Sequence, residues 1–152
     1  MNSRRHKNTE RKILLDQIDS AFADASRPPV CRDIVTQEDF EKAFMGDELA
    51  NTIHRLYDYD EDEVHYLTPF LMKSYLDHYG ENYEKDVDLA HYLFWFNGFR
   101  EGDDFIRRRH LSFYSRFDAE QRKCVCSFLT FLVKYEMDES FIDEDVVEYW
   151  CE

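Results

Sequence analysis

Turn-forming residues are scarce in this chain of 152 residues, which holds only four glycines and three prolines. Average usage is about 7% glycine and about 5% proline, so a chain of this length ordinarily carries about 18 of them. A β-sandwich or barrel needs a tight turn after each short strand. The shortage of turn formers, together with an apolar content of 43%, favours an all-α fold.

Positive charge is also in deficit. The chain carries 19 lysines and arginines against 33 aspartates and glutamates, which gives a formal net charge of −14. Because phosphate contacts depend on basic side chains, this balance argues against direct nucleic-acid binding and against adhesion to anionic membranes. It suits a basic protein partner. The alternative is an acidic surface that serves solubility alone.

Long apolar runs are missing as well. None reaches the ~18 residues of a membrane span, and the charged segment Met1–Lys12 is not followed by the apolar stretch of a secretion signal. The four cysteines, at positions 31, 124, 126 and 151, form no Cys-x-x-Cys pair. Cys124 and Cys126 are two residues apart, so on a helix they point in different directions. We therefore expect reduced thiols and a cytoplasmic protein.

The chain is rich in apolar residues at helical spacing, as in Leu14, Ile18 and Phe22. Capping residues at Thr36 and Asp118 mark helix starts, and glycines and Pro28-Pro29 mark helix ends. Thr68 followed by Pro69 is also a typical helix start. The expected helices run from Glu10 to before Pro28, from Thr36 to Gly46, from Asp47 onward, from Thr68 to Gly80, from Asp86 to Gly98, from Asp118 to Glu136, and from about Ser140 to the end.

These elements predict a single all-α domain over residues 10–152, an irregular bundle of about six or seven helices. Residues 1–9 are polar and basic, and we expect them to be frayed. The least regular part is 99–117, where Gly102 breaks the pattern and a short helix over Asp103–Arg109 is expected. Leu111–Phe113 reads as extended or irregular, and its alternative is a small ribbon with Val30–Val35.

Three stretches resemble a family of small uncharacterised bacterial proteins that is classed as a domain of unknown function. They are the helix Ile13–Phe22 followed by Arg27-Pro28-Pro29, the segment Tyr66–Leu71, and Phe117–Arg122 with the apolar helix after it. Together they span most of residues 11–136. This sequence departs from the family pattern at Thr68, which separates Leu67 from Pro69. The resemblance implies a small helical domain and transfers no activity and no site residues.

Two patterns are compared with known metal sites, and both are incomplete. Asp58, Asp60 and Asp62 have the alternate spacing of an EF-hand loop, but the required glycine and the bidentate glutamate are replaced by Glu63 and Pro69. Carboxylate and histidine stand three residues apart in Asp62…His65 and Asp88…His91, yet the inward glutamates of a dinuclear helical site are missing. We therefore expect no metal and no cofactor.

The strongest candidate for partner binding is the acidic segment of residues 57–63. Five carboxylates in six residues repel one another, so a basic protein partner would relieve the repulsion and speed encounter. Two interleaved tyrosines offer rigid contact area. The alternative is an ordinary solvated connector. The predicted partner-binding residues are Tyr57, Asp58, Tyr59, Asp60, Glu61, Asp62 and Glu63.

No catalytic motif is present: there is no Gly-rich phosphate loop, no Gly-x-Ser-x-Gly and no His-Glu-x-x-His. The basic cluster Arg107–His110 is flanked by acidic residues that offset its charge, and it is expected to pair with the acidic surface of the same molecule. The sequence thus favours a non-enzymatic acidic protein-binding module, and an immunity-type inhibitor of a basic toxin or nuclease is its specific form. The alternatives are a metal-dependent enzyme that uses His65 and His91, and a DNA mimic that blocks a nucleic-acid-binding protein.

Overall fold

The fold is an all-α bundle, as the sequence predicts. The computed structural model describes residues 2–44, 59–78, 93–135 and 142–152, and within these ranges it has seven α-helices, two 3-10 turns and no strand. The expected helix from Asp47 and most of the one from Asp86 lie outside the described residues. The elements are α1 (Asn2–Ala21), η1 (Pro29–Cys31), α2 (Gln37–Phe44), α4 (Glu61–His78), α6 (Phe94–Asn97), η2 (Gly98–Arg100), α7 (Asp104–Ser115), α8 (Ala119–Lys134) and α9 (Glu144–Cys151).

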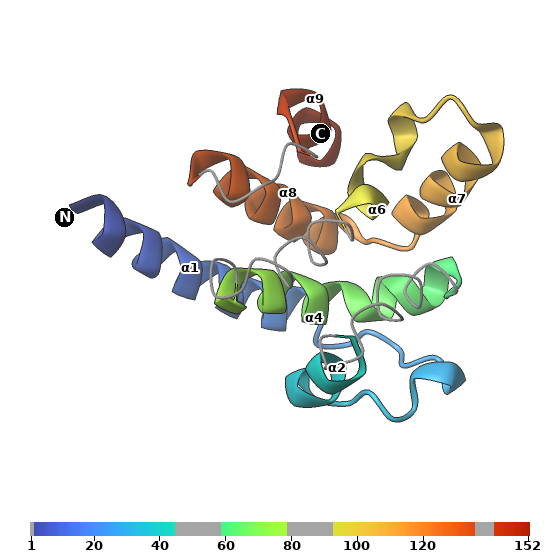
Figure 1. Cartoon of the computed structure of the whole chain (residues 1–152), viewed down its shortest axis with the longest axis horizontal. Helices are drawn as coiled ribbons and strands as arrows, with labels where there is room; N and C mark the ends of the chain where they lie inside the picture. Colours follow the sequence, from blue (N-terminus) through green and yellow to red (C-terminus); the bar gives the residue numbers. More distant parts are fainter. Residues whose placement is uncertain (1, 45–58, 79–92, 136–141) are drawn as a thin grey trace.

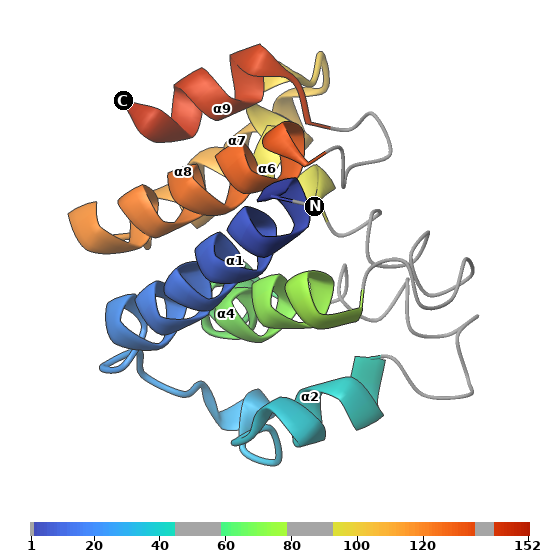
Figure 2. The same cartoon turned by 90° about the vertical axis from the view of Figure 1, so that its left-hand side faces the viewer.

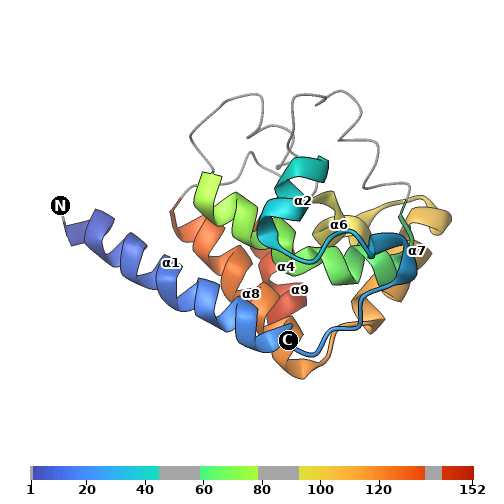
Figure 3. The ribbon, with the colours of Figure 1, turned by 90° about the horizontal axis from the view of Figure 1, so that it is seen from below.

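The helices stack in an order that does not follow the chain. Figure 2 shows α1 between α8 and α4, with α2 on the far side of α4 and α9 on the far side of α8. The N-terminus of α1 projects from one end of the molecule, and α7 lies at the opposite end (Figures 1 and 3). Among the described residues, no helix combines the length and apolarity that crossing a membrane requires.

Apolar faces of α1, α4 and α8 meet in the core. The stripe predicted for α1 is buried, because residues four apart lie on one face of a helix. The core of α8 is built in the same way, and it includes Phe128, which packs edge-on against the ring of Tyr75 from α4 with 6.0 Å between centroids. The main buried residues of the three helices, together with Phe22 directly after α1, are Leu14, Ile18, Phe22, Leu67, Leu71, Met72, Tyr75, Val125, Phe128, Leu129 and Leu132.

Reciprocal capping boxes begin three of the helices, and two of them were predicted. At α2, the Asp39 backbone N–H donates to Thr36 Oγ1 (3.1 Å) and the Thr36 N–H donates to Asp39 Oδ2 (3.0 Å). At α8, the Gln121 N–H donates to Asp118 Oδ1 (2.8 Å) and the Asp118 N–H donates to Gln121 Oε1 (3.1 Å). Both boxes satisfy backbone donors that have no partner within the helix.

The third capping box corrects the start of α4. The Glu63 N–H donates to Asp60 Oδ1 (3.0 Å) and the Asp60 N–H donates to Glu63 Oε1 (3.1 Å), so the helix begins at Glu61. The helix start expected at Thr68 is therefore wrong, and Pro69 lies inside the helix. The Thr68 hydroxyl donates to the Val64 carbonyl (2.7 Å) within the helix and caps nothing.

Two further helix bounds differ from the prediction. Helix α1 begins at Asn2, whereas the sequence predicts a start at Glu10; the fraying of residues 1–9 stays a prediction. Leu111–Phe113 is neither irregular nor part of a ribbon, because it belongs to α7. Asp103 caps that helix by accepting hydrogen bonds from the Phe105 and Ile106 backbone N–H groups (2.8 and 3.1 Å). The helix therefore starts at Asp104, directly after its cap, and it continues to Ser115.

Candidate functional site

The predicted acidic segment forms the first turn of α4 where it is described, while Tyr57 and Asp58 lie outside the described residues. Asp60 and Glu63 cap the helix. Glu61 accepts a hydrogen bond from Arg109 Nε (3.1 Å), and Asp62 accepts one from Arg116 Nε (2.7 Å).

The fold itself thus gives these carboxylates partners, whereas the prediction considered only their mutual repulsion. Negative charge is stabilising at a helix N-terminus, and the two arginines are Arg109 of α7 and Arg116, which directly follows α7. The half-buried Tyr59 precedes this turn. The assignment of residues 57–63 to partner binding stays a prediction.

Arg109 connects three elements at one end of the bundle. Its Nη2 donates to the Tyr59 carbonyl (2.8 Å) and its Nε to Glu61, while its guanidinium lies 4.9 Å from the centroid of the Trp95 ring. Arg107 pairs with Asp104 on α7 itself. The expectation that this basic cluster pairs with acidic neighbours is confirmed for these two arginines.

A pocket of about 260 Å³ opens between α6, η2 and α7. Its walls are largely apolar, and two large side chains at its edge are solvent-exposed: Phe105 is 65% exposed and Ile106 is 45% exposed. The pocket is lined by Trp95, Gly98, Glu101, Phe105, Ile106, Arg109 and His110. Sequence reasoning missed it. Phe105-Ile106 next to three arginines was a usable signal, because that local pattern leaves these two residues outside a core stripe.

His110 forms the buried part of the pocket lining. The residue is 2% exposed, and its Nδ1 lies 3.1 Å from the Trp95 carbonyl oxygen. Its Nε2 is buried without a hydrogen-bond partner among the described residues. Burial lowers the pKa of the imidazole to about 4. The ring is therefore neutral at pH 7, and Nδ1 carries the proton that it donates to the carbonyl.

Gly98 permits the close approach of η2 to α7. A Cβ at this position would lie 2.8 Å from the His110 Cβ, which is attached to the α7 backbone and cannot swing aside. Any other residue would push the two elements apart. The pocket thus depends on a glycine as well as on its aromatic walls.

Among the described residues, no group of three or more His, Cys, Asp or Glu side chains could hold a metal ion. His65 bonds to Gln121 Oε1 through Nε2 (2.9 Å), burial lowers its pKa, and its ring packs edge-on against Phe117. His91 and Asp88 lie outside the described residues.

Between α2 and α4, Glu41 accepts hydrogen bonds from the Ser74 hydroxyl (3.2 Å) and from His78 Nε2 (2.9 Å). In a hydrolytic triad the imidazole, not the carboxylate, accepts the serine proton. The Gln37 side-chain amide joins the same cluster by donating to Ser74 Oγ (2.7 Å). The cluster therefore links two helices, and in it the Ser74 hydroxyl donates to a carboxylate and not to an imidazole.

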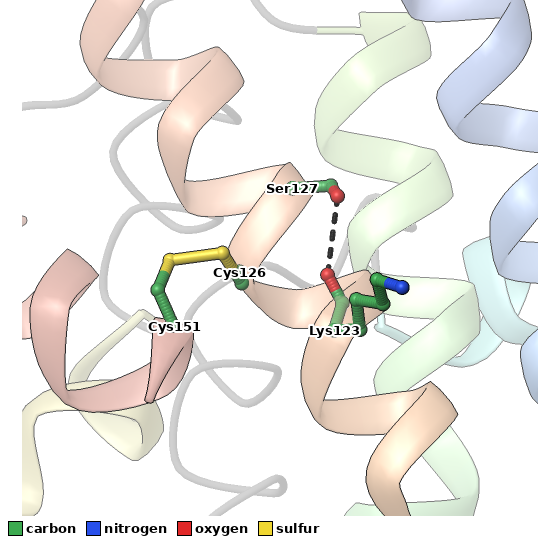
Figure 4. The surroundings of a disulfide bond; sticks show 4 residues. All are labelled: Lys123, Cys126, Ser127 and Cys151. Carbon is green, nitrogen blue, oxygen red and sulfur yellow. Dashed lines mark hydrogen bonds between the residues drawn. A yellow bond between two sulfur atoms is a disulfide. The ribbon is translucent and has the colours of Figure 1, made fainter.

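A disulfide joins Cys126 of α8 to Cys151 at the end of α9 (Figure 4), with 4.9 Å between the Cα atoms. The expectation of four reduced thiols is wrong for this pair. Cys124 and Cys126 do point in different directions: Cys124 is buried in the core and Cys126 faces α9. Cys31 and Cys124 are buried free thiols, and burial raises their pKa values to about 11 and about 12. Because disulfides persist in oxidising compartments, the cytoplasmic expectation loses the support it drew from the thiols.

Helix α9 packs directly behind the pocket. The Trp150 indole N–H donates to the Phe96 carbonyl (2.8 Å), and the Tyr149 ring stacks on Phe99 with 4.0 Å between centroids. At the start of α9, Asp143 accepts a hydrogen bond from Arg100 Nη1 (2.5 Å), which lowers the pKa of its carboxyl. The rings of Tyr149 and Trp150 lie 5.4 and 6.1 Å from that of His110.

Comparison of the chain with protein-family models, with curated proteins and with solved structures found no match. The resemblance to a family of uncharacterised bacterial proteins over residues 11–136 therefore stays a prediction, and the geometry of the site alone carries the functional argument.

Proposed function

We propose that this protein is a non-enzymatic protein-binding module that takes an apolar side chain of its partner into the pocket between α6 and α7. The observation that carries the proposal is the exposure of Phe105 and Ile106 at the edge of an apolar pocket. Large apolar side chains grouped at the surface of a concave site are typical of interaction sites. Covering them with a partner would remove apolar area from water.

A protein side chain suits this pocket better than a small polar metabolite. Sites for small molecules hold their ligand with a few converging polar groups. Here the Arg109 guanidinium already bonds Glu61 and the Tyr59 carbonyl. The neutral His110 donates its Nδ1 proton to the Trp95 carbonyl, which leaves its buried Nε2 as an acceptor. The pocket thus offers mainly apolar contact, as pockets for aromatic and aliphatic anchor residues do.

Charge supports a basic partner. The net charge of −14 attracts a basic protein over long distances and opposes the approach of a second copy of this chain. The predicted acidic segment lies next to the pocket, since Arg109 touches both, and Glu101 lines the pocket itself. In its most specific form the proposal is an immunity-type inhibitor of a basic toxin or nuclease, which a toxin reading frame beside the gene would support.

Selection of random displayed peptides on the immobilised protein tests the proposal. We expect enrichment of peptides that carry an aromatic or aliphatic residue flanked by lysine or arginine. The Phe105→Asp variant should weaken their binding by about tenfold or more, because it places a charge at the apolar edge of the pocket. Raising NaCl from about 0.05 M to about 0.5 M should also weaken it, since salt screens exposed charges.

Leu111→Asp is the matched control for this experiment. Leu111 lies on the same helix, is 51% exposed and does not line the pocket, so the same charge there should change the dissociation constant less than about twofold. Enriched peptides that bind both variants equally would contradict the placement of the site. Enrichment of acidic peptides would contradict the basic partner.

A further inference from the structure

We propose that the Cys126–Cys151 disulfide controls the pocket: when oxidised it holds α9 behind His110 and Phe99, and when reduced it releases α9 and loosens the pocket. The ligand of the pocket rests on the function proposed above. The release of α9 rests on separate observations.

Helix α9 is too short to persist without tertiary support. It has eight residues, and isolated helices shorter than about 12 residues are marginal in water. Asp143 fastens its start to Arg100, and Val146 and Trp150 are buried against the bundle. Its last residue, Cys151, carries the disulfide. The covalent bond therefore holds the end of the helix at which fraying would otherwise begin.

The two residues just before Cys151 connect the disulfide to the pocket through aromatic contacts. Tyr149 stacks on Phe99, with the ring planes only 7° apart, and Phe99 directly follows the pocket residue Gly98. Trp150 packs edge-on against Phe96 and His110, with centroids 5.5 and 6.1 Å apart. Release of α9 would remove these aromatic contacts at once and would expose the ring of His110 on the side away from the pocket.

The disulfide is placed where a thiol can reach it, because Cys151 is exposed and Cys126 is half-buried. A dithiol reductant supplies the electrons. One of its thiolates attacks the Cys151 sulfur, the bond between the two protein sulfurs breaks, and Cys126 leaves as a thiolate that takes up a proton. The second thiol of the reductant then closes its own disulfide and releases Cys151 as a thiol. Two electrons and two protons pass to the protein, and the reductant is oxidised.

Hydrogen exchange measured by mass spectrometry tests the release of α9 directly. The oxidised protein, the same protein in dithiothreitol, and a Cys126→Ser, Cys151→Ser double variant are compared. In the second and third samples we expect the amides of residues 146–152 to lose their protection from exchange. Amides of residues 98–110 should lose part of their protection, and those of α1 and α8 should exchange as in the oxidised protein. Dithiothreitol should not change the double variant, and reoxidation should restore the wild-type protection.

Binding of a peptide selected on the oxidised protein tests the link to the pocket. We expect reduction to weaken it by about tenfold, the ordinary size of coupling between two sites. Protected α9 amides in the fully reduced protein would overturn the proposal, as would loss of protection throughout the chain, which would make the disulfide a support of the whole fold. Release of α9 with unchanged exchange over 98–110 and unchanged affinity would also overturn it. If no peptide binds the oxidised protein, the proposed function fails, and exchange over 98–110 still decides the effect on the pocket.

Discussion

At the scale of single residues, His110 makes stability depend on pH. In the folded protein its pKa is about 4, because burial disfavours the charged ring, whereas an unfolded histidine titrates near 6.5. Acid therefore favours the unfolded state, which takes up the proton first. The contribution of His110 to the free energy of unfolding is fully present above about pH 6.5 and is lost as the pH falls towards 4. At about pH 5 the loss is about 2 kcal/mol relative to high pH. Urea unfolding at about pH 7.5 and about pH 5 measures it.

The His110→Gln variant isolates this contribution. Glutamine is uncharged at both pH values, so the variant should lose less stability between about pH 7.5 and about pH 5 than the wild type does. Other groups whose pKa values are shifted, including His65 and Glu63, are present in both proteins and cancel in the difference. An equal loss in the two proteins would mean that His110 is charged or accessible in the folded state.

At the scale of elements, local capping patterns identify two helix starts, although the equally local box of Asp60 and Glu63 at α4 was missed. Thr36 and Asp118 were found because the cap and its partner lie three residues apart in the chain. Thr68-Pro69 wrongly predicts a helix start. The apolar stripe of Val64, Leu67 and Leu71 continues across this pair, and all three residues are buried. That stripe outweighs the one backbone hydrogen bond that proline cannot donate.

The site could be predicted less well than the helices because its parts meet only through tertiary packing. The local pattern marks Phe105 and Ile106 as apolar residues outside a core stripe, but the pocket beside them forms only where α6 and η2 pack against α7. The directions of Cys124 and Cys126 followed from their spacing, but the partner of Cys126 lies 25 residues away on α9. Which cysteine pairs with Cys126 therefore depends on how α9 packs against α8.

The cap of α4 should contribute measurably to the stability of the fold. Asp60→Ala should lower the free energy of unfolding by about 1 kcal/mol, because the Glu63 backbone N–H loses its acceptor. Asp60→Ser is the matched control, since a serine hydroxyl can still cap and should recover most of the loss. Thermal unfolding of the three proteins measures the effect. Equal melting temperatures for the serine and alanine variants would mean that the carboxylate acts through charge and not as a cap.

At the scale of the whole molecule, the negative charge is unevenly placed. The C-terminal part of the chain holds eight acidic residues and no lysine or arginine over residues 136–152, and on α9 the described ones are exposed. Exposed ion pairs such as Lys73–Asp19 and Arg11–Asp77 join α1 to α4. They contribute little to stability, because their charges stay hydrated and are screened by salt.

The dependence of the melting temperature on salt shows whether the ion pairs or the net charge has the larger effect on the stability of the fold. Self-repulsion at −14 destabilises the compact state, while the surface pairs oppose it only weakly. Raising NaCl from about 0.05 M to about 0.5 M screens both, so the melting temperature should rise, by about 3 °C for each kcal/mol of repulsion removed. Glu148→Gln with Glu152→Gln, at one exposed position of α9 and at the exposed residue that follows it, should raise the melting temperature already at low salt and reduce the further gain. A melting temperature that falls with salt would show that the ion pairs dominate. If salt stabilises the fold and yet weakens peptide binding, the acidic surface opposes folding and favours the partner, which is the behaviour expected of charge retained for recognition.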